Sequence, residues 1–141
     1  MVDLTHQVPI EAPAARVYAA VATTDGNRGW WTADSVVDTR AGGKAEFGFE
    51  RRAVVFHMRI DRLVPGEAVV MACTGGQPEW AGTTLSWTIA SDGEQSVLRF
   101  THGGWKELSD YCASCNSMWG RLMYRLKDYV ETGKADPQWR E

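Results

Sequence analysis

The chain has 141 residues, of which 44% are hydrophobic and 23% charged, a composition typical of a globular domain rather than a disordered segment. Its formal net charge is −3 and its acidic and basic residues are interleaved, which argues against a nucleic acid partner. The apolar runs are too short to cross a bilayer and the first residues do not resemble a secretory signal, so we expect one cytoplasmic domain over residues 1–141 with no membrane partner.

Two short helices are predicted after a first strand. Residues 3–10 alternate weakly between apolar and polar side chains, which indicates a strand. Pro13 then opens a segment with apolar side chains at helical spacing, so we expect a helix over about 13–22. Residues 25–27 should break it, and a second short helical piece is predicted at 28–31.

Two adjacent tryptophans, Trp30 and Trp31, end this region. Indole is the largest side chain, and its ring N–H needs a hydrogen-bond partner when it is buried. A pair of indoles beside a flexible turn suggests the rim of a cavity. The alternative is that both only plug the end of the core.

From Ser35 onwards the hydrophobic pattern has a period of two, which predicts β-strands. Turn signals separate the segments, among them "GG" at 42–43, "PG" at 65–66 and "SDGEQ" at 91–95. The pattern therefore predicts an antiparallel meander of six or seven strands, with a long loop at 75–82 that isolates Trp80. The predicted strand segments are "SVVDT", "AEFGF", "VVFHMRIDRL", "AVVMACT", "TTLSWTIA" and "SVLRFTH".

The last part of the chain predicts one long amphipathic helix, because apolar side chains recur there at spacings of three and four. Ser109 or Asp110 is expected to cap its start, and Gly133 to end it. About 24 residues at ~1.5 Å each would span roughly 36 Å, enough to cross a sheet. The apolar stripe consists of Leu108, Cys112, Cys115, Trp119, Leu122, Leu126 and Val130.

Several stretches resemble the family related to the activator of the Hsp90 ATPase, within the START/Bet v 1-like (SRPBCC) superfamily. They are "VPIEAPAARVYAAVATTDGNRGWW", "GG" at 42–43 with the "AEFGF" that follows, "RLVPGEAVVMAC", "GTTLSWTI", "VLRFTHGGW" and "RLKDYVETG". The resemblance implies an α+β helix-grip fold of two layers, a curved antiparallel sheet around the long C-terminal helix, with the two short helices after the first strand. Members of the superfamily typically hold an apolar cavity between sheet and helix, and include lipid carriers, polyketide cyclases and co-chaperone domains.

The leading functional hypothesis is binding of a hydrophobic or aromatic small molecule in such a cavity. The alternative is a polyketide cyclase-like or hydrolase-like enzyme that uses the same cavity, with His102 as the candidate catalytic residue, because a histidine on the inner face could act as a general base. A second alternative is a co-chaperone-like interaction module. The sequence predicts no cofactor and leaves open the oligomeric state, a homodimer included.

The candidate ligand-binding residues share the apolar face of their strands or the stripe of the long helix, so they should converge on one space. Tyr111, Tyr124 and Trp80 are further candidates for its mouth, with ordinary packing as the alternative. The candidate set is Trp31, Phe47, Phe49, Met58, Trp87, Phe100, His102, Cys115, Trp119 and Leu122.

Three cysteines form no complete disulfide framework, and Cys112 and Cys115 make a C-x-x-C pair. Neither a thioredoxin-like context nor further ligands accompany the pair, so we expect reduced thiols that face the cavity, and no metal site. The remaining polar strand residues are expected on the outer, solvated face of the sheet. They are Glu46, Glu50, Arg51, Arg52, His57 and Arg59.

Overall fold

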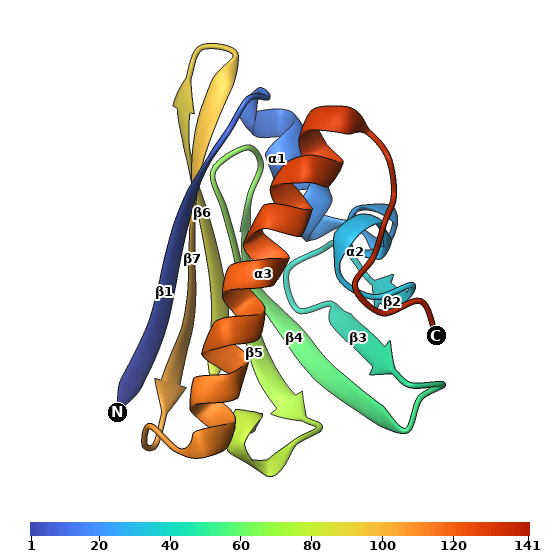
Figure 1. The fold of residues 1–141 in the computed structure, drawn as a ribbon, viewed down its shortest axis with the longest axis vertical. Helices are drawn as coiled ribbons and strands as arrows, with labels where there is room; N and C mark the ends of the chain where they lie inside the picture. The colour runs from blue at the N-terminus through green and yellow to red at the C-terminus, as the bar shows by residue number, and fades with distance from the viewer.

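The computed structural model describes all 141 residues and confirms the predicted fold class. A curved antiparallel sheet of seven strands carries the long helix on one face (Figure 1). The elements are β1 (Val2–Ile10), α1 (Ala14–Ala22), α2 (Thr24–Trp30), β2 (Asp34–Val37), β3 (Lys44–Phe49), β4 (Val54–Val64), β5 (Ala68–Gly75), the 3₁₀ turn η1 (Pro78–Trp80), β6 (Thr84–Asp92), β7 (Gln95–Trp105) and α3 (Asp110–Thr132).

The strand order is β1-β7-β6-β5-β4-β3-β2, so consecutive strands from β2 to β7 are neighbours and the first strand closes beside the last. This order follows from the short turns that the sequence indicates, since a tight turn can only join antiparallel neighbours. Alternating side chains then place one apolar face toward α3. No helix is long and apolar enough to pass through a membrane.

Helix α2 begins earlier than predicted, at Thr24 rather than at residue 28. The Thr23 side chain caps it by accepting a hydrogen bond from the Gly26 N–H at 2.9 Å. Gly26 is needed for space, because a Cβ there would overlap the carbonyl of Ala19 in α1. The Asn27 amide donates to the Val21 carbonyl at 3.1 Å, so residues that were expected to break a helix instead join two helices.

The ends of α3 match the prediction. The Ser109 hydroxyl accepts from the Cys112 N–H at 3.1 Å, and Gly133 ends the helix in the left-handed conformation. Among the strands, α3 packs most closely against β1, whereas the β3–β4 hairpin at the other side of the sheet diverges from it (Figure 1). The helix and the sheet therefore form a wedge that is closed over β1 and wider beside β3 and β4.

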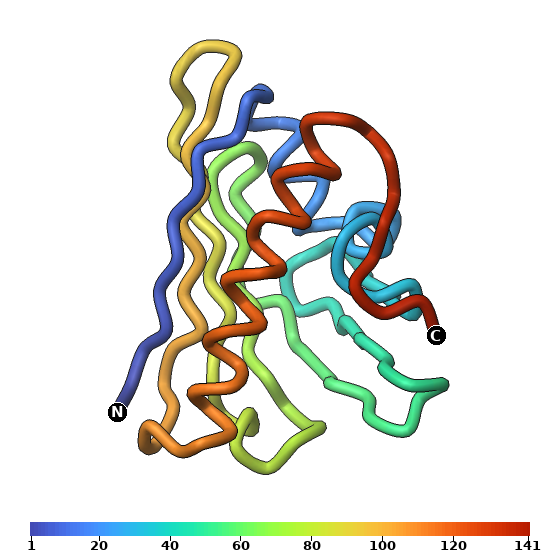
Figure 2. The backbone as a smooth tube through the Cα atoms, in the orientation of Figure 1, coloured from blue at the N-terminus to red at the C-terminus, as the bar shows by residue number.

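The tail after α3 folds back along α2 and ends near β2 (Figure 2). Three backbone N–H groups hold it there. Asp136 donates to Gly29 at 2.9 Å, Gln138 to Trp30 at 3.2 Å, and Trp139 to Trp31 at 3.0 Å. The tail thereby adds a wall to the wide side of the wedge.

Candidate functional site

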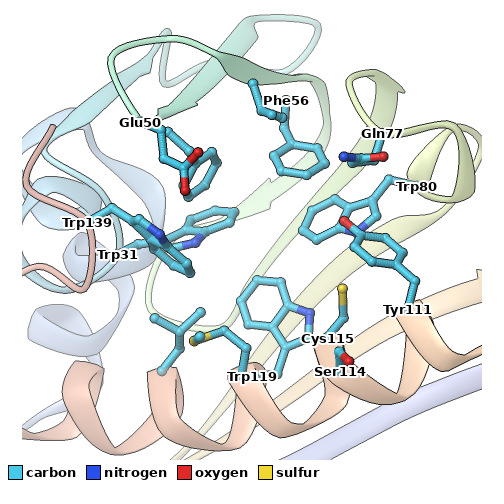
Figure 3. A pocket seen from close by; sticks show the side chains of 14 residues that line it. Trp31, Glu50, Phe56, Gln77, Trp80, Tyr111, Ser114, Cys115, Trp119 and Trp139 are labelled. Atoms are coloured by element: carbon cyan, nitrogen blue, oxygen red, sulfur yellow. The ribbon is translucent and has the colours of Figure 1, made fainter.

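A pocket of about 330 Å³ occupies the wide side of the wedge. Its walls come from α3, the β3–β4 hairpin, η1 and the C-terminal tail (Figure 3). Eleven of its 14 lining residues are hydrophobic, and a volume near 300 Å³ is at the small end of small-molecule sites. The lining residues are Trp31, Phe49, Glu50, Val54, Phe56, Gln77, Trp80, Tyr111, Ser114, Cys115, Met118, Trp119, Leu122 and Trp139.

Half of the candidate ligand-binding residues line this pocket, namely Trp31, Phe49, Cys115, Trp119 and Leu122. The other half do not reach it: Phe47, Met58, Trp87, Phe100 and His102 are fully buried in the core. The space under the middle of α3 is thus filled, and the pocket is displaced toward β3 and β4.

Trp119 and Trp31 separate the core from the pocket. The Trp119 ring lies 4.3 Å from Phe100, and the Trp31 ring lies 4.3 Å from Phe47, measured between ring centroids. The inward-facing side chains of the sheet and of α3 therefore converge as expected. The indoles of Trp31 and Trp119 fill the space where they meet. The alternation of apolar and polar residues along a strand identifies the face of the sheet on which a side chain lies. It does not show whether a tryptophan from another element separates that side chain from the pocket.

Of the adjacent tryptophans, Trp30 lies in the core and Trp31 lines the pocket. The two indoles are stacked, with ring centroids 5.6 Å apart. Trp30 is fully buried and donates its ring N–H to the Ala20 carbonyl at 2.9 Å, whereas Trp31 lines the pocket wall. The Trp31 ring therefore packs between Trp30 and Phe47 of the sheet.

His102 is hydrogen-bonded at both ring nitrogens. The Trp119 Nε1–H donates to His102 Nδ1 at 3.0 Å, which leaves the proton on Nε2 because an indole N–H can only donate. Nε2–H then donates to Thr83 Oγ1 at 2.8 Å, and the Thr83 hydroxyl donates to the Trp80 carbonyl at 2.6 Å. This chain of hydrogen bonds connects α3 through β7 to η1.

The environment of His102 suits a structural role rather than proton transfer. Burial lowers its pKa from 6.5 to about 3, so the ring is neutral at physiological pH. Its side chain is fully buried and has no free nitrogen that could face a ligand. His102 instead fixes Trp119 and, through Thr83, the backbone of Trp80, and both of these indoles line the pocket.

The sequence interpretation did not include the lining residues Val54, Phe56, Gln77, Ser114, Met118 and Trp139. Trp139 lies 17 positions after Leu122, the last helix residue of the candidate set, and only the returning tail brings it to Phe49, at a centroid distance of 4.9 Å. Trp80 and Tyr111, considered for the mouth, do line the pocket, whereas Tyr124 is exposed elsewhere on α3.

Glu50 also departs from the expectation, because it lines the pocket instead of belonging only to the outer face. The turn after β3 has three consecutive non-glycine residues, Glu50, Arg51 and Arg52, with positive φ. Such a run is unusual and redirects the chain. Arg52 supports the turn on the outer face through Asp34 at 2.8 Å and Glu46 at 2.6 Å, as the solvated pattern predicted.

The two cysteines of the C-x-x-C pair lie in different places. Cys112 is completely buried in the core, and Cys115, one turn later, lines the pocket. Burial raises the pKa of both thiols, which is the opposite of what a redox-active pair needs. Both cysteines are free in the structure, and no group of three or more histidine, cysteine or acidic side chains is arranged to hold a metal ion.

The thiols offer a direct probe of this geometry. With iodoacetamide at pH 7.5, Cys115 is expected to react more slowly than a cysteine in an unfolded peptide, because its raised pKa leaves less thiolate. Cys112 should react only after denaturation. Peptide mass spectrometry over a time course measures both rates, and equal rapid labelling of the two would contradict the burial described above.

The fold, with its long helix held against a curved sheet and an apolar pocket at their wide side, defines a helix-grip domain of the START/Bet v 1-like type. A model of the family described as Activator of Hsp90 ATPase homolog 1-like protein matches residues 11–131. The match spans most of the chain, and the chain therefore belongs to this family. A search of curated proteins gives no match.

Solved structures agree with this assignment. The Aha1 dimer from Colwellia psychrerythraea is 32% identical, with 95% of this chain and 99% of that chain covered and a TM-score of 0.86. The protein SSP2350 from Staphylococcus saprophyticus is 14% identical, with coverages of 99% and 98% and a TM-score of 0.80. DynU16, from the dynemicin biosynthetic locus, is 20% identical, with coverages of 99% and 51% and a TM-score of 0.79. The last two matches show the fold alone.

Proposed function

We propose that this protein binds a hydrophobic, aromatic small molecule in the pocket between α3 and the β3–β4 hairpin. The observation that carries the proposal is a preformed space of about 330 Å³ walled by four indoles, those of Trp31, Trp80, Trp119 and Trp139. Aromatic walls bury a large apolar area and favour a planar partner through stacked or edge-to-face contacts. At ~30 Å³ per water molecule, the space equals about eleven waters, which suits a compound of one or two rings.

The packing and hydrogen bonds of the wall residues support the proposal. Trp31 stacks on Trp30, and Trp119 is held by its hydrogen bond to His102. The η1 turn is fixed by the Thr83 N–H and hydroxyl, which donate to the Trp80 carbonyl at 2.9 and 2.6 Å. A pocket that is already formed does not have to order its side chains on binding, which is one of the main costs of association.

A thermal-shift screen of compounds with one or two aromatic rings tests the proposal. A ligand present at a hundredfold excess over its Kd should add about 2.7 kcal/mol of stability and raise the Tm by several degrees. Met118→Trp should fill the pocket and abolish the shift, because Met118 is half-buried at its wall. Val36→Trp, at an exposed position of β2, is the control variant and should keep the shift.

The proposal fails if no compound shifts the Tm of the wild-type protein. It also fails if Met118→Trp shifts as much as the wild type, because binding would then occur elsewhere. Neither outcome depends on a catalytic activity.

A second candidate function is self-association, which the Colwellia psychrerythraea relative favours because its solved structure is a dimer. That relative covers nearly the whole of this chain at 32% identity. Sedimentation equilibrium over a range of protein concentrations tests this candidate. A mass of one chain, 15.7 kDa, at all concentrations would exclude it.

A further inference from the structure

The two edge strands of the sheet differ in what covers them. At one edge, side chains of α2 bind the outer backbone groups of β2. The Val37 N–H donates to Thr24 Oγ1 at 2.8 Å, and this hydroxyl donates in turn to the Val37 carbonyl at 3.2 Å. Arg28 Nε donates to the Ser35 carbonyl at 2.9 Å. At the opposite edge, β1 runs for nine residues, and Figure 1 shows no element beyond it.

Part of the β1 backbone faces away from β7. Pro9 marks this side, because proline has no N–H and the Pro9 carbonyl accepts a hydrogen bond from Lys127 Nζ at 2.7 Å. The backbone groups of successive residues in an antiparallel strand point alternately to its two sides, so Thr5 and Gln7 face the same way as Pro9. Outside the pairing of β1 with β7, the backbone of Thr5 and that of Gln7 make no hydrogen bond. Each of these two residues therefore offers a free N–H and a free C=O.

The free part of this edge is short and has two definite ends. After it, Pro9 cannot donate, and the Glu11 N–H already donates to Glu131 Oε2 at 2.8 Å. Before it, the register with β7 shifts ahead of Leu4. Edge strands usually carry a lysine, a proline or a covering segment that prevents pairing with another chain. Residues 4–8 contain neither lysine nor proline, and no other segment covers their outer backbone.

A second copy of this chain fits such an edge. If two β1 strands pair antiparallel about a two-fold axis close to Thr5, each free N–H of one copy meets a free C=O of the other. Thr5 and Gln7 are exposed and uncharged, so their side chains bring no like charges together. The interface is closed, because both copies use the same edge and the β2 edge is already covered.

We propose that the outer edge of β1 is the interface of a homodimer, in which the sheets of two copies join into one continuous sheet through Thr5 and Gln7. This inference rests on self-association, the second candidate function, since it names the surface that would carry it. The dimeric state of the relative from Colwellia psychrerythraea, at 32% identity, favours a second copy over an unrelated peptide as the occupant of this edge.

Thr5→Pro tests the proposal, because it deletes one central N–H from each copy. Pro9 already occupies an outward position of the same strand, so the fold should accept a second proline there. Sedimentation equilibrium should show a dimer Kd raised by about tenfold or more, the effect of losing two hydrogen bonds. Thr5→Lys should also raise the Kd severalfold, because it places two positive charges side by side at the two-fold axis.

Two variants serve as matched controls. Thr5→Val keeps the backbone N–H and the β-branched shape and removes only the hydroxyl. Thr88→Lys adds the same charge at an exposed position of β6, which is not an edge strand. Both should leave the dimer Kd within about twofold of the wild-type value, a change that is small on the scale of one hydrogen bond. Thermal melts by circular dichroism check that every variant is folded.

Amide hydrogen exchange provides a readout that needs no variant. At protein concentrations above the dimer Kd, the Thr5 and Gln7 amides should exchange more slowly than they do below it. A dimer whose Kd is unchanged by both Thr5→Pro and Thr5→Lys, or whose Thr5 and Gln7 amides still exchange rapidly, would overturn the inference and leave self-association intact. A wild-type mass of 15.7 kDa at all concentrations would instead count against self-association itself.

Discussion

Replacing Trp119 with alanine is expected to lower the free energy of unfolding by about 3–5 kcal/mol, the range for truncating a large aromatic side chain in a packed core. Trp119 is 2% exposed, and its ring meets five others at centroid distances between 4.3 and 6.2 Å. Its partners are Trp31, Trp80, Trp87, Phe100 and His102. The substitution also leaves the buried His102 Nδ1 without its donor, which adds a desolvation cost.

Urea denaturation followed by circular dichroism measures this loss, with Tyr124→Ala as the matched control. Tyr124 is an exposed aromatic residue on the same helix, so its truncation should change stability by no more than about 0.5 kcal/mol. Trp119→Phe keeps most of the ring contacts but removes the N–H, and it should fall between the two. A loss below about 1.5 kcal/mol for Trp119→Ala would show that the pocket side relaxes around the missing indole, contrary to the packing described above.

Acidification is expected to destabilise the protein well above the range in which carboxylates titrate. The pKa of His102 is about 3 in the folded protein and near 6.5 in the unfolded chain, because burial disfavours the charged ring. The unfolded state therefore takes up a proton as the pH falls below 6.5, whereas the folded state does not until about pH 3. Stability due to the neutral ring is complete above pH 6.5 and is lost progressively as the pH falls through this window.

The expected slope is about 1.4 kcal/mol per pH unit, which amounts to roughly 2–3 kcal/mol between pH 6.5 and 4.5. Urea denaturation at half-unit pH intervals measures it. His102→Gln should lower stability at neutral pH and flatten this slope, whereas His57→Gln, which changes an exposed histidine of β4, should retain it. A wild-type stability that is constant from pH 6.5 to 4.5 would contradict the buried neutral state of His102.

Both ring nitrogens of His102, the candidate catalytic residue of the sequence analysis, are hydrogen-bonded inside the protein. Alternation along β7 correctly places it on the inner face, with Leu98 and Phe100. Alternation along the strand does not show which groups hydrogen-bond to the imidazole. Here Trp119 is bonded to Nδ1 and Thr83 to Nε2. A residue's face is a local property, whereas its hydrogen-bond partners come from distant segments.

Among the candidate ligand-binding residues, those on the helix were easier to assign from sequence than those on the sheet. Residues on the α3 stripe, such as Cys115, Trp119 and Leu122, were identified because a helix fixes their common direction, and all three line the pocket. Sheet residues were harder to assign, since Phe49 lines the pocket and Phe47, two positions earlier on the same face, does not. The divergence of the hairpin from α3 separates these two, and no local pattern encodes it.

The sequence by itself determined the order of the elements, the faces of the strands and the ends of α3, because these depend on local periodicity, turn residues and caps. Only the tertiary structure decided where the open space lies. The chain fills the centre of the wedge with Trp31 and Trp119, places Glu50 at the pocket rim through a left-handed bend, and brings Trp139 back from the tail to complete the wall. Packing is a property of all the side chains together, so the same apolar pattern is compatible with a closed core at one end of the helix and a pocket at the other.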